Sequence, residues 1–307
     1  MKAFVTDMFA LPLPAGHRFP ADKYRLLRER VDASMLFRPG DLAIPRAATD
    51  EQLLRVHTAA YIEALEKGTL TEAEQRRIGF PWWPGMAERA RRTTGGTIEA
   101  CRAALAEGVA VNLAGGTHHA FPDAGEGFCL FNDAAVAIRA MQAEGRIRRA
   151  VVIDLDVHQG NGTASIFRDD PSVFTFSVHG ERNFPLRKEP SDLDIGLPDG
   201  VTDEDYLRAV EEGTREAIRR AEAEMAVYLA GADPHEGDRL GRMAVTTEGL
   251  RRRDGMVLGM CHEARLPVAV CMAGGYGKDI AVTADLYMQT VRVAWEWWLR
   301  GRASGTA

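Results

Sequence analysis

Asp156 and His158 stand two residues apart at the end of the run Val151-Val152-Ile153-Asp154-Leu155-Asp156-Val157-His158. Alternate side chains of a strand point to the same side, so Asp154, Asp156 and His158 project together. A carboxylate and an imidazole suit zinc, and a catalytic zinc usually takes three protein ligands and a water. This run therefore predicts two ligands of a catalytic metal, and the third must come from elsewhere.

The simplest alternative is that these polar residues only enter a solvated loop after the strand. Three β-branched residues precede them, and such a run is typical of a strand buried on both faces. A carboxylate without a partner would be costly there. The pattern therefore favours a metal site, although a short motif alone does not decide the question.

Four further segments carry groups that could do chemistry, and three of them follow a short apolar run. Taken singly, each has an ordinary interpretation, because loop histidines are usually solvated and aromatic residues usually pack in a core. Together they would bring two histidines, an acid and a phenol to the carboxyl edge of a parallel sheet, where ligands bind in open α/β folds. The groups are His118 and His119 after Gly115-Gly116-Thr117, Phe128 in Gly127-Phe128-Cys129, Asp233 in Ala230-Gly231-Ala232-Asp233, and Tyr276 in Gly274-Gly275-Tyr276.

With the run Asp154-Leu155-Asp156-Val157-His158-Gln159-Gly160-Asn161-Gly162, these strings resemble the histone deacetylase superfamily of zinc amidohydrolases. That superfamily also contains acetoin-utilisation proteins and acetylpolyamine amidohydrolases. The segments 92–98 and 236–241, with Gln159 after the ligand histidine, are most similar to its class IV branch.

The resemblance implies a division of labour at the metal. Asp156, His158 and Asp233 would bind one Zn²⁺ per chain, which lowers the pKa of a bound water and polarises the scissile carbonyl. His119 would accept the proton of the attacking water, and Tyr276 would donate to the oxyanion. The resemblance also implies that Asp154 holds His118, so that the two histidines titrate as a coupled pair.

Residues around this centre also match the family, with two departures. One is Met272-Ala273 before Gly274-Gly275-Tyr276, where many members have more glycines, which leaves Tyr276 in place. Several branches have an acidic residue where this chain has Asn161, the expected partner of His119, so that histidine is expected to be less basic here. Gly127 would offer a backbone acceptor to the substrate amide. Phe128 and Phe184 would wall a narrow tunnel that suits an extended acylated amine, such as an acyl-lysine or a polyamine. Asp154 and Ser177 match a site for K⁺ or Na⁺.

The elements that must position these groups indicate an α/β fold of the arginase/deacetylase-like kind, a single domain over residues 1–307. Short apolar runs alternate with amphipathic segments, as a parallel sheet with helices on both faces requires. No linker divides the chain, and a hydrophobic content of 46% fits a substantial core. Helices are predicted over about 51–67, 87–107, 133–144, 203–224, 247–264 and 279–299.

Surface expectations follow from composition. A net charge of −6 gives no basic footprint for nucleic acid, and Arg251-Arg252-Arg253 is expected to be a solvated helix face. No segment has the length of a signal peptide or a membrane span, and the four cysteines lack Cys-x-x-Cys spacing, so a cytoplasmic protein is expected. Trp82-Trp83 could form the substrate rim or an oligomer contact. The oligomeric state stays open.

Two other function classes compete with the zinc deacylase. A dinuclear manganese ureohydrolase of the same fold needs more bridging carboxylates, and Asn161 and Gln159 stand where these are expected. A non-catalytic acyl-lysine binding module would not need the full set of His119, Tyr276 and three ligands. Sequence does not reveal the physiological substrate or the acyl length.

Overall fold

A single sheet of eight parallel strands forms the centre of the protein, in the order β2-β1-β3-β8-β7-β4-β5-β6. The structure is a computed structural model and describes residues 1–9, 11–14 and 16–303. The α/β parallel-sheet fold expected from the sequence is thereby confirmed. The strands are β1 (Ala3–Phe4), β2 (Leu42–Ala43), β3 (Val109–Asn112), β4 (Ala150–Asp154), β5 (Val173–Gly180), β6 (Leu193–Leu197), β7 (Met225–Leu229) and β8 (Val268–Cys271).

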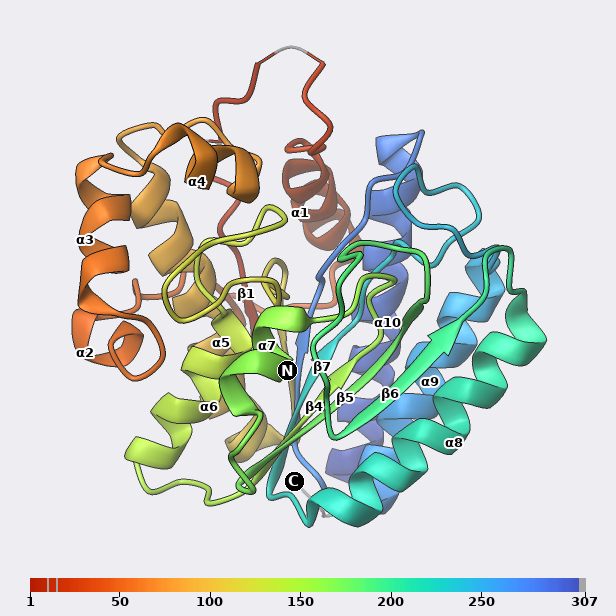
Figure 1. Cartoon of the computed structure of the whole chain (residues 1–307). Coiled ribbons are helices and arrows are strands. Elements are labelled where there is room, and N and C mark those ends of the chain that lie inside the picture. Colours follow the sequence, from red (N-terminus) through yellow and green to blue (C-terminus); the bar gives the residue numbers. More distant parts are fainter. Residues whose placement is uncertain (10, 15, 304–307) are drawn as a thin grey trace.

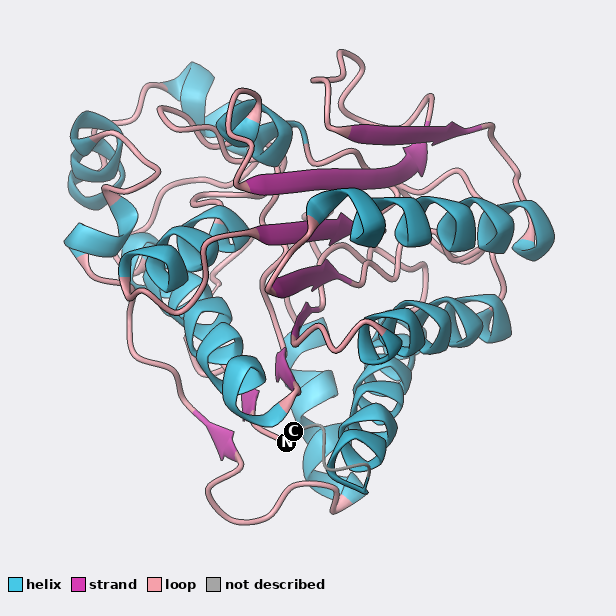
Figure 2. Cartoon of the chain, turned by 90° about the horizontal axis from the view of Figure 1, so that it is seen from below, coloured by secondary structure: helices cyan, strands magenta, loops and turns pink. Residues whose placement is uncertain are grey.

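Helices cover both faces of this sheet (Figure 1). α8, α9 and α10 lie on one side, with α1 packed on α10, whereas α5 and α6 lie on the other (Figure 1). Seen from below, the strands are stacked between these two groups of helices (Figure 2). The helices are α1 (Lys23–Ser34), α2 (Asp50–Leu53), α3 (Ala59–Lys67), α4 (Glu72–Ile78), α5 (Met86–Glu107), α6 (Asp133–Ala143), α7 (Asn161–Phe167), α8 (Asp203–Ala221), α9 (Thr247–Glu263) and α10 (Ile280–Ala303).

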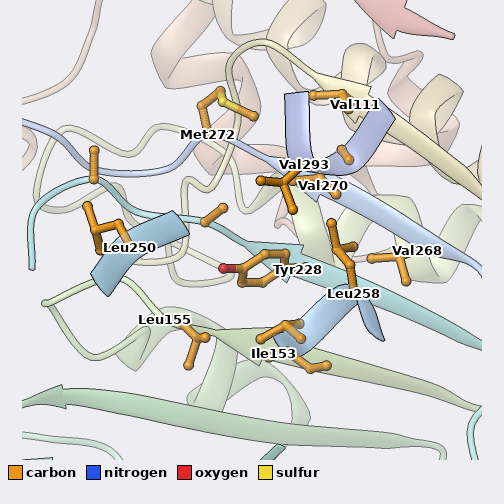
Figure 3. Packing of buried hydrophobic residues seen from close by; sticks show 14 of the residues in the cluster. Val111, Ile153, Leu155, Tyr228, Leu250, Leu258, Val268, Val270, Met272 and Val293 are labelled. Carbon is orange, nitrogen blue, oxygen red and sulfur yellow. The ribbon is translucent and has the colours of Figure 1, made fainter. Parts of the chain in front are cut away.

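The central strands are apolar on both faces because each face has its own core. In β4, Val151 and Ile153 belong to the core under α8–α10, whereas Ala150 and Val152 belong to the core under α5 and α6. The same alternation continues past the strand end, so Leu155 and Val157 are buried in the first core. Figure 3 shows Ile153 and Leu155 in that core, near Tyr228. Asp154, Asp156 and His158 therefore turn to the opposite side.

Three of the expected helices differ from the structure, and one of them, α10, continues to Ala303 past the expected end at 299. The single helix expected over 51–67 is two helices, α2 and α3, because Thr58 begins a new one by accepting a hydrogen bond from the Tyr61 amide at 3.4 Å. α8 ends at Ala221, where Glu222 takes a left-handed conformation with φ 45°. Three helices, α1, α4 and α7, were not expected, and α4 and α7 are only seven residues long.

The expectation for Arg251-Arg252-Arg253 was wrong at its last residue. Arg251 and Arg252 are exposed, but Arg253 is fully buried and forms an ion pair with Asp254 at 2.8 Å. Arg253 also donates to the Gly231 carbonyl oxygen at 2.5 Å. A buried guanidinium is tolerated when its donors are satisfied in this way, which a run of arginines in the sequence cannot reveal.

The two tryptophans of 82–83 are half-buried and do not form an exposed pair. The Trp82 indole donates to the Leu65 carbonyl oxygen at 2.8 Å, and Trp83 packs edge-on against Phe80. They fix the segment after α4 onto the domain and do not line the pocket described below.

Candidate active site

Four neighbouring strands, β3, β8, β7 and β4, deliver the groups that the sequence singled out. Because these strands are parallel, their carboxyl ends meet at one edge of the sheet. The segment after β3 brings His118 and His119, and the segment after β8 brings Tyr276. The segment after β7 brings Asp233, and the segment after β4 brings Asp156 and His158. Residues more than a hundred positions apart thus form one cluster.

The ligand atoms of the three expected metal-binding residues lie within 4.8 Å of one another. His158 Nδ1 is 2.9 Å from Asp156 Oδ1 and 3.1 Å from Asp233 Oδ2, and all three side chains are buried. Ligands about 2.0–2.2 Å from a tetrahedral zinc lie about 3.3 Å from one another, so these atoms are spaced as ligands of one ion. Among the described residues no other group of three such side chains has this spacing. The donor set therefore fits one small divalent cation.

Backbone amides orient both carboxylates. Asp156 Oδ2 accepts from the Gly274 amide at 2.7 Å, and Asp233 Oδ1 accepts from the Val157 amide at 2.9 Å. Burial and the neighbouring Asp156 charge raise the pKa of Asp233 to about 7. Two buried carboxylates at this spacing call for a cation between them, which is the electrostatic role that a metal would take.

The adjacent histidines face different partners. His118 Nδ1 is 2.6 Å from Asp154 Oδ2, and both side chains are buried. Burial lowers the pKa of His118, but Asp154 and Asp156 outweigh burial and raise that pKa to about 9. The pKa of His119 is lowered well below its ordinary value by burial and by the charges of His118 and His158. One histidine is thus held as a cation, and the other as a neutral base.

His119 has an extended set of supporting partners. Its Nδ1 lies 2.7 Å from Asn161 Oδ1, as the sequence predicted. Asn161 Nδ2 donates to Glu126 Oε1 at 3.0 Å, and Glu126 is paired with Arg77 at 2.6 Å. Because a carboxylate can only accept, the amide nitrogen must face Glu126 and the amide oxygen must face His119. The hydrogen of neutral His119 is therefore on Nδ1, which leaves Nε2 free to accept a proton.

Tyr276 lies next to His158 and Phe128 and is the last member of the cluster. Its side chain is 8% exposed, and its ring centre is 6.0 Å from that of His158 and 5.9 Å from that of Phe128. Burial, with the charges of Asp156 and Asp233, raises the pKa of Tyr276 well above its ordinary value. The phenol consequently stays protonated and can act as a hydrogen-bond donor.

A pocket of about 360 Å³ leads to this cluster. His119, His158 and Tyr276 are on its wall, together with the three residues that the sequence assigned to substrate binding, Gly127, Phe128 and Phe184. The Phe184 ring lies edge-on to His119 at 5.0 Å between ring centres. The full lining is Arg18, Arg76, Arg77, Ile78, Gly79, His119, Gly127, Phe128, His158, Arg182, Asn183, Phe184, Leu186, Leu240, Arg242 and Tyr276.

The residues expected to hold a monovalent cation are neighbours across β4 and β5. Asp154 is paired in register with Ser177, and both are buried. The Ser177 hydroxyl lies 3.0 Å from His179 Nδ1, and Asp154 is engaged with His118. The site for K⁺ or Na⁺ stays a prediction.

Several residues that support the site were not found from the sequence. Asp238 accepts from the Tyr276 amide at 2.6 Å. Lys23, fully buried, donates to the Gly275 carbonyl oxygen at 3.1 Å. Asp133 accepts from the Thr117 amide at 2.7 Å and so fixes the turn before the two histidines. A charged residue beside a motif, as Asp133 is, could have served as a signal, but nothing near Lys23 in the sequence points to the site.

The sequence and the fold of this chain are similar to those of known proteins. The family model described as "Histone deacetylase domain" matches residues 17–292. An uncharacterized protein of Picosynechococcus is 46% identical over 272 residues, covering 89% of this chain and 91% of its own. Histone deacetylase 2 of Arabidopsis thaliana is 29% identical, covering 91% of this chain and 75% of its own. The crystal structure of a histone deacetylase homologue from Aquifex aeolicus superposes with a TM-score of 0.82 at 26% identity, covering 95% and 83% of the two chains.

The part of the chain that the structure describes contains no membrane-spanning helix. Not one of its helices combines the length and the apolar character that crossing a bilayer requires.

Proposed function

Because the chain belongs to the histone deacetylase family, we propose that it is a zinc-dependent amidohydrolase that removes an acyl group from an acylated amine. The observation that carries the proposal is that Asp156 and Asp233 converge on His158, which lines a pocket that also presents His119 and Tyr276. An acyl-lysine, a polyamine or a related small molecule would enter this pocket with its amide toward the ligands.

The chain's own groups account for the proton movements of amide hydrolysis. A bound zinc would supply a Lewis acid for the carbonyl and lower the pKa of the attacking water. His119 Nε2 would accept the proton of that water and pass a proton to the leaving amine. The Tyr276 hydroxyl would donate to the oxyanion as its charge develops. His118, held by Asp154, would stay cationic beside this centre and favour the developing negative charge.

Two observations favour this proposal over its alternatives. A dinuclear ureohydrolase would need carboxylates near positions 159 and 161, but Gln159 binds the 189–194 segment and Asn161 binds His119. The described residues offer one group of three ligands, which suits one ion. A binding module would not need a neutral base, a protonated phenol and three ligands in one cluster. The four buried, free cysteines suit the reducing cytoplasm proposed as its compartment.

The test is hydrolysis of one lysine peptide that carries acyl groups from acetyl to myristoyl, by zinc-loaded protein. We expect turnover that falls on the order of a hundredfold or more in Tyr276→Phe, because the oxyanion loses its donor. His119→Ala should lose activity to a similar extent while retaining zinc. The preferred acyl length reports the depth of the pocket.

Stoichiometric zinc measured on the same samples provides the control. Full activity in Tyr276→Phe would contradict the proposed mechanism, and zinc-loaded wild type that hydrolyses no member of the series would exclude acyl-lysine peptides as its substrates.

A further inference from the structure

The mouth of the pocket is unusually basic for a protein of net charge −6. Its lining contains five arginines and no aspartate or glutamate. The arginines come from four separate parts of the chain and are brought together by folding. The cluster could therefore not be predicted from a basic segment of the sequence. They are Arg18 before α1, Arg76 and Arg77 on α4, Arg182 after β5, and Arg242 before α9.

Neighbouring acids compensate only part of this charge. Arg182 and Arg242 share one carboxylate, Asp199, at 4.0 and 3.2 Å. Arg76 pairs with Glu72 at 3.2 Å in an exposed helical pair, a kind of contact that contributes little. The pairs at Glu72, Glu126 and Asp199 leave two of the five charges unbalanced.

Arg18 is the most available of the five. It is exposed, and its guanidinium has no acceptor within hydrogen-bond distance among the described residues. Arg239 stands beside it and donates to the carbonyl oxygens of Arg18 and Tyr276, which adds a further cation close to the mouth.

The positive charge of the arginines at the mouth acts on the part of the substrate that does not enter the pocket. The scissile carbonyl must reach the metal ligands, so the portion too large for the pocket remains among the arginines. Arginine matches carboxylates and phosphates through its planar set of donors, and a cluster of one sign steers oppositely charged ligands. Acylated polyamines, which carry free ammonium groups, would meet repulsion there.

Resting on the proposed deacylase function, we propose that this mouth selects acylated amines that carry carboxylate groups near the scissile amide. An acyl-lysine flanked by acidic residues and a small N-acyl amine with a free carboxylate share this chemistry. The overall acidity of the chain would suggest the reverse preference, so the local charge is the deciding feature.

The test uses three acetyl-lysine peptides that differ only in their flanking residues, glutamate, serine or lysine. We expect kcat/KM for the glutamate peptide to exceed that for the lysine peptide by at least roughly tenfold at low ionic strength, and the ratio to shrink at about 0.5 M salt. Nε-acetyl-lysine with a free carboxylate, compared with its amide, shows whether a single small-molecule carboxylate is sufficient.

Matched variants link the preference to the mouth. Arg18→Gln/Arg76→Gln should bring the glutamate-to-lysine ratio toward one. Arg215→Gln is the control and should leave the ratio unchanged, because Arg215 forms an equivalent exposed pair with Glu211 at 3.1 Å on α8, away from the pocket.

A binding measurement separates this inference from the proposed function. Fluorescence anisotropy of the same peptides, labelled with an uncharged dye, is read on zinc-loaded Tyr276→Phe. Tighter binding of the glutamate peptide supports the basic mouth even when no peptide is hydrolysed. Equal binding, or preference for the lysine peptide, would overturn the inference even when deacylation is efficient.

Discussion

The side-chain amide of Asn161 occupies the position beside His119 where several branches of the family have a carboxylate, and it orients that histidine. Its Oδ1 accepts from His119, and its Nδ2 donates to Glu126, so the Glu126 carboxylate decides which way the amide faces. Glu126 thereby acts on His119 through Asn161, without approaching it. Burial and the charges of His118 and His158 lower the pKa of His119, and the hydrogen bond to Asn161 offsets only part of that decrease.

This arrangement predicts that Glu126→Gln has opposite effects on kcat in the wild type and in Asn161→Asp. Glu126→Gln should lower kcat by roughly tenfold in the wild type, because nothing then fixes the Asn161 amide. In Asn161→Asp the new carboxylate faces Glu126, and the like charges repel. Glu126→Gln should therefore raise kcat in that background. Steady-state kinetics on the best acyl-lysine peptide measures both effects.

A role of Glu126 limited to folding would lower kcat in both backgrounds by the same factor. Circular dichroism and zinc content of the four proteins establish that they are equally folded and loaded.

At the scale of elements, the loop between β8 and α10 must pass close to the metal ligands. Gly274 donates its amide to Asp156, and a Cβ atom there would overlap both Asp156 and Asp233 oxygens. The φ of Gly274 is not in the left-handed region, so backbone conformation does not require glycine there. Glycine is required because the backbone lies too close to the two carboxylates to leave room for a Cβ atom.

Gly274→Ala should therefore weaken zinc binding by at least roughly tenfold, because the carboxylates must move apart to make room. Competition with a chromophoric zinc chelator measures the affinity. Gly255→Ala in α9 is the matched control, since a Cβ there meets no atom within 4 Å. Zinc affinity of Gly274→Ala equal to that of Gly255→Ala would refute this explanation of the glycine.

At the scale of the whole molecule, His57 connects the α2–α3 region to the segments around the site. Its Nδ1 lies 3.0 Å from the Phe121 carbonyl oxygen, and its Nε2 accepts from the Asn132 amide at 3.0 Å. Burial lowers the pKa of His57 to about 4, from an ordinary 6.5. The folded protein therefore holds His57 neutral where the unfolded chain protonates it.

Between these two values the unfolded state binds more protons, so the free energy of unfolding falls as the pH falls. We expect His57 to account for a loss of about 2 kcal/mol between pH 7.5 and pH 5. Urea unfolding of wild type and His57→Gln at both pH values measures it, and the difference between the proteins removes other titrating groups. A gap between the two proteins that does not change with pH would rule out this role.

The α/β class, the parallel sheet and the polar groups that follow the strands could all be predicted from the sequence. This prediction is possible because a strand buried on both faces has a recognisable short apolar sequence, and the polar residues that follow it are adjacent in the chain. The break between α2 and α3 was missed although Thr58 caps α3 through a local hydrogen bond from the Tyr61 amide, a signal that the sequence does offer. The contact of His57 with the Phe121 carbonyl oxygen, by contrast, arises only on folding. The burial of Arg253 likewise arises only on folding.

The order of the strands in the sheet could not be predicted from the sequence and is known only from the fold. The order β3-β8-β7-β4 places side by side four strand ends that are far apart in sequence. This adjacency brings His119, Tyr276 and His158 to one pocket and Asp233 against His158. The basic mouth is likewise a product of folding, because its arginines lie on four segments. Side-chain type is local information, whereas strand order and surface charge arise from long-range packing that no local pattern encodes.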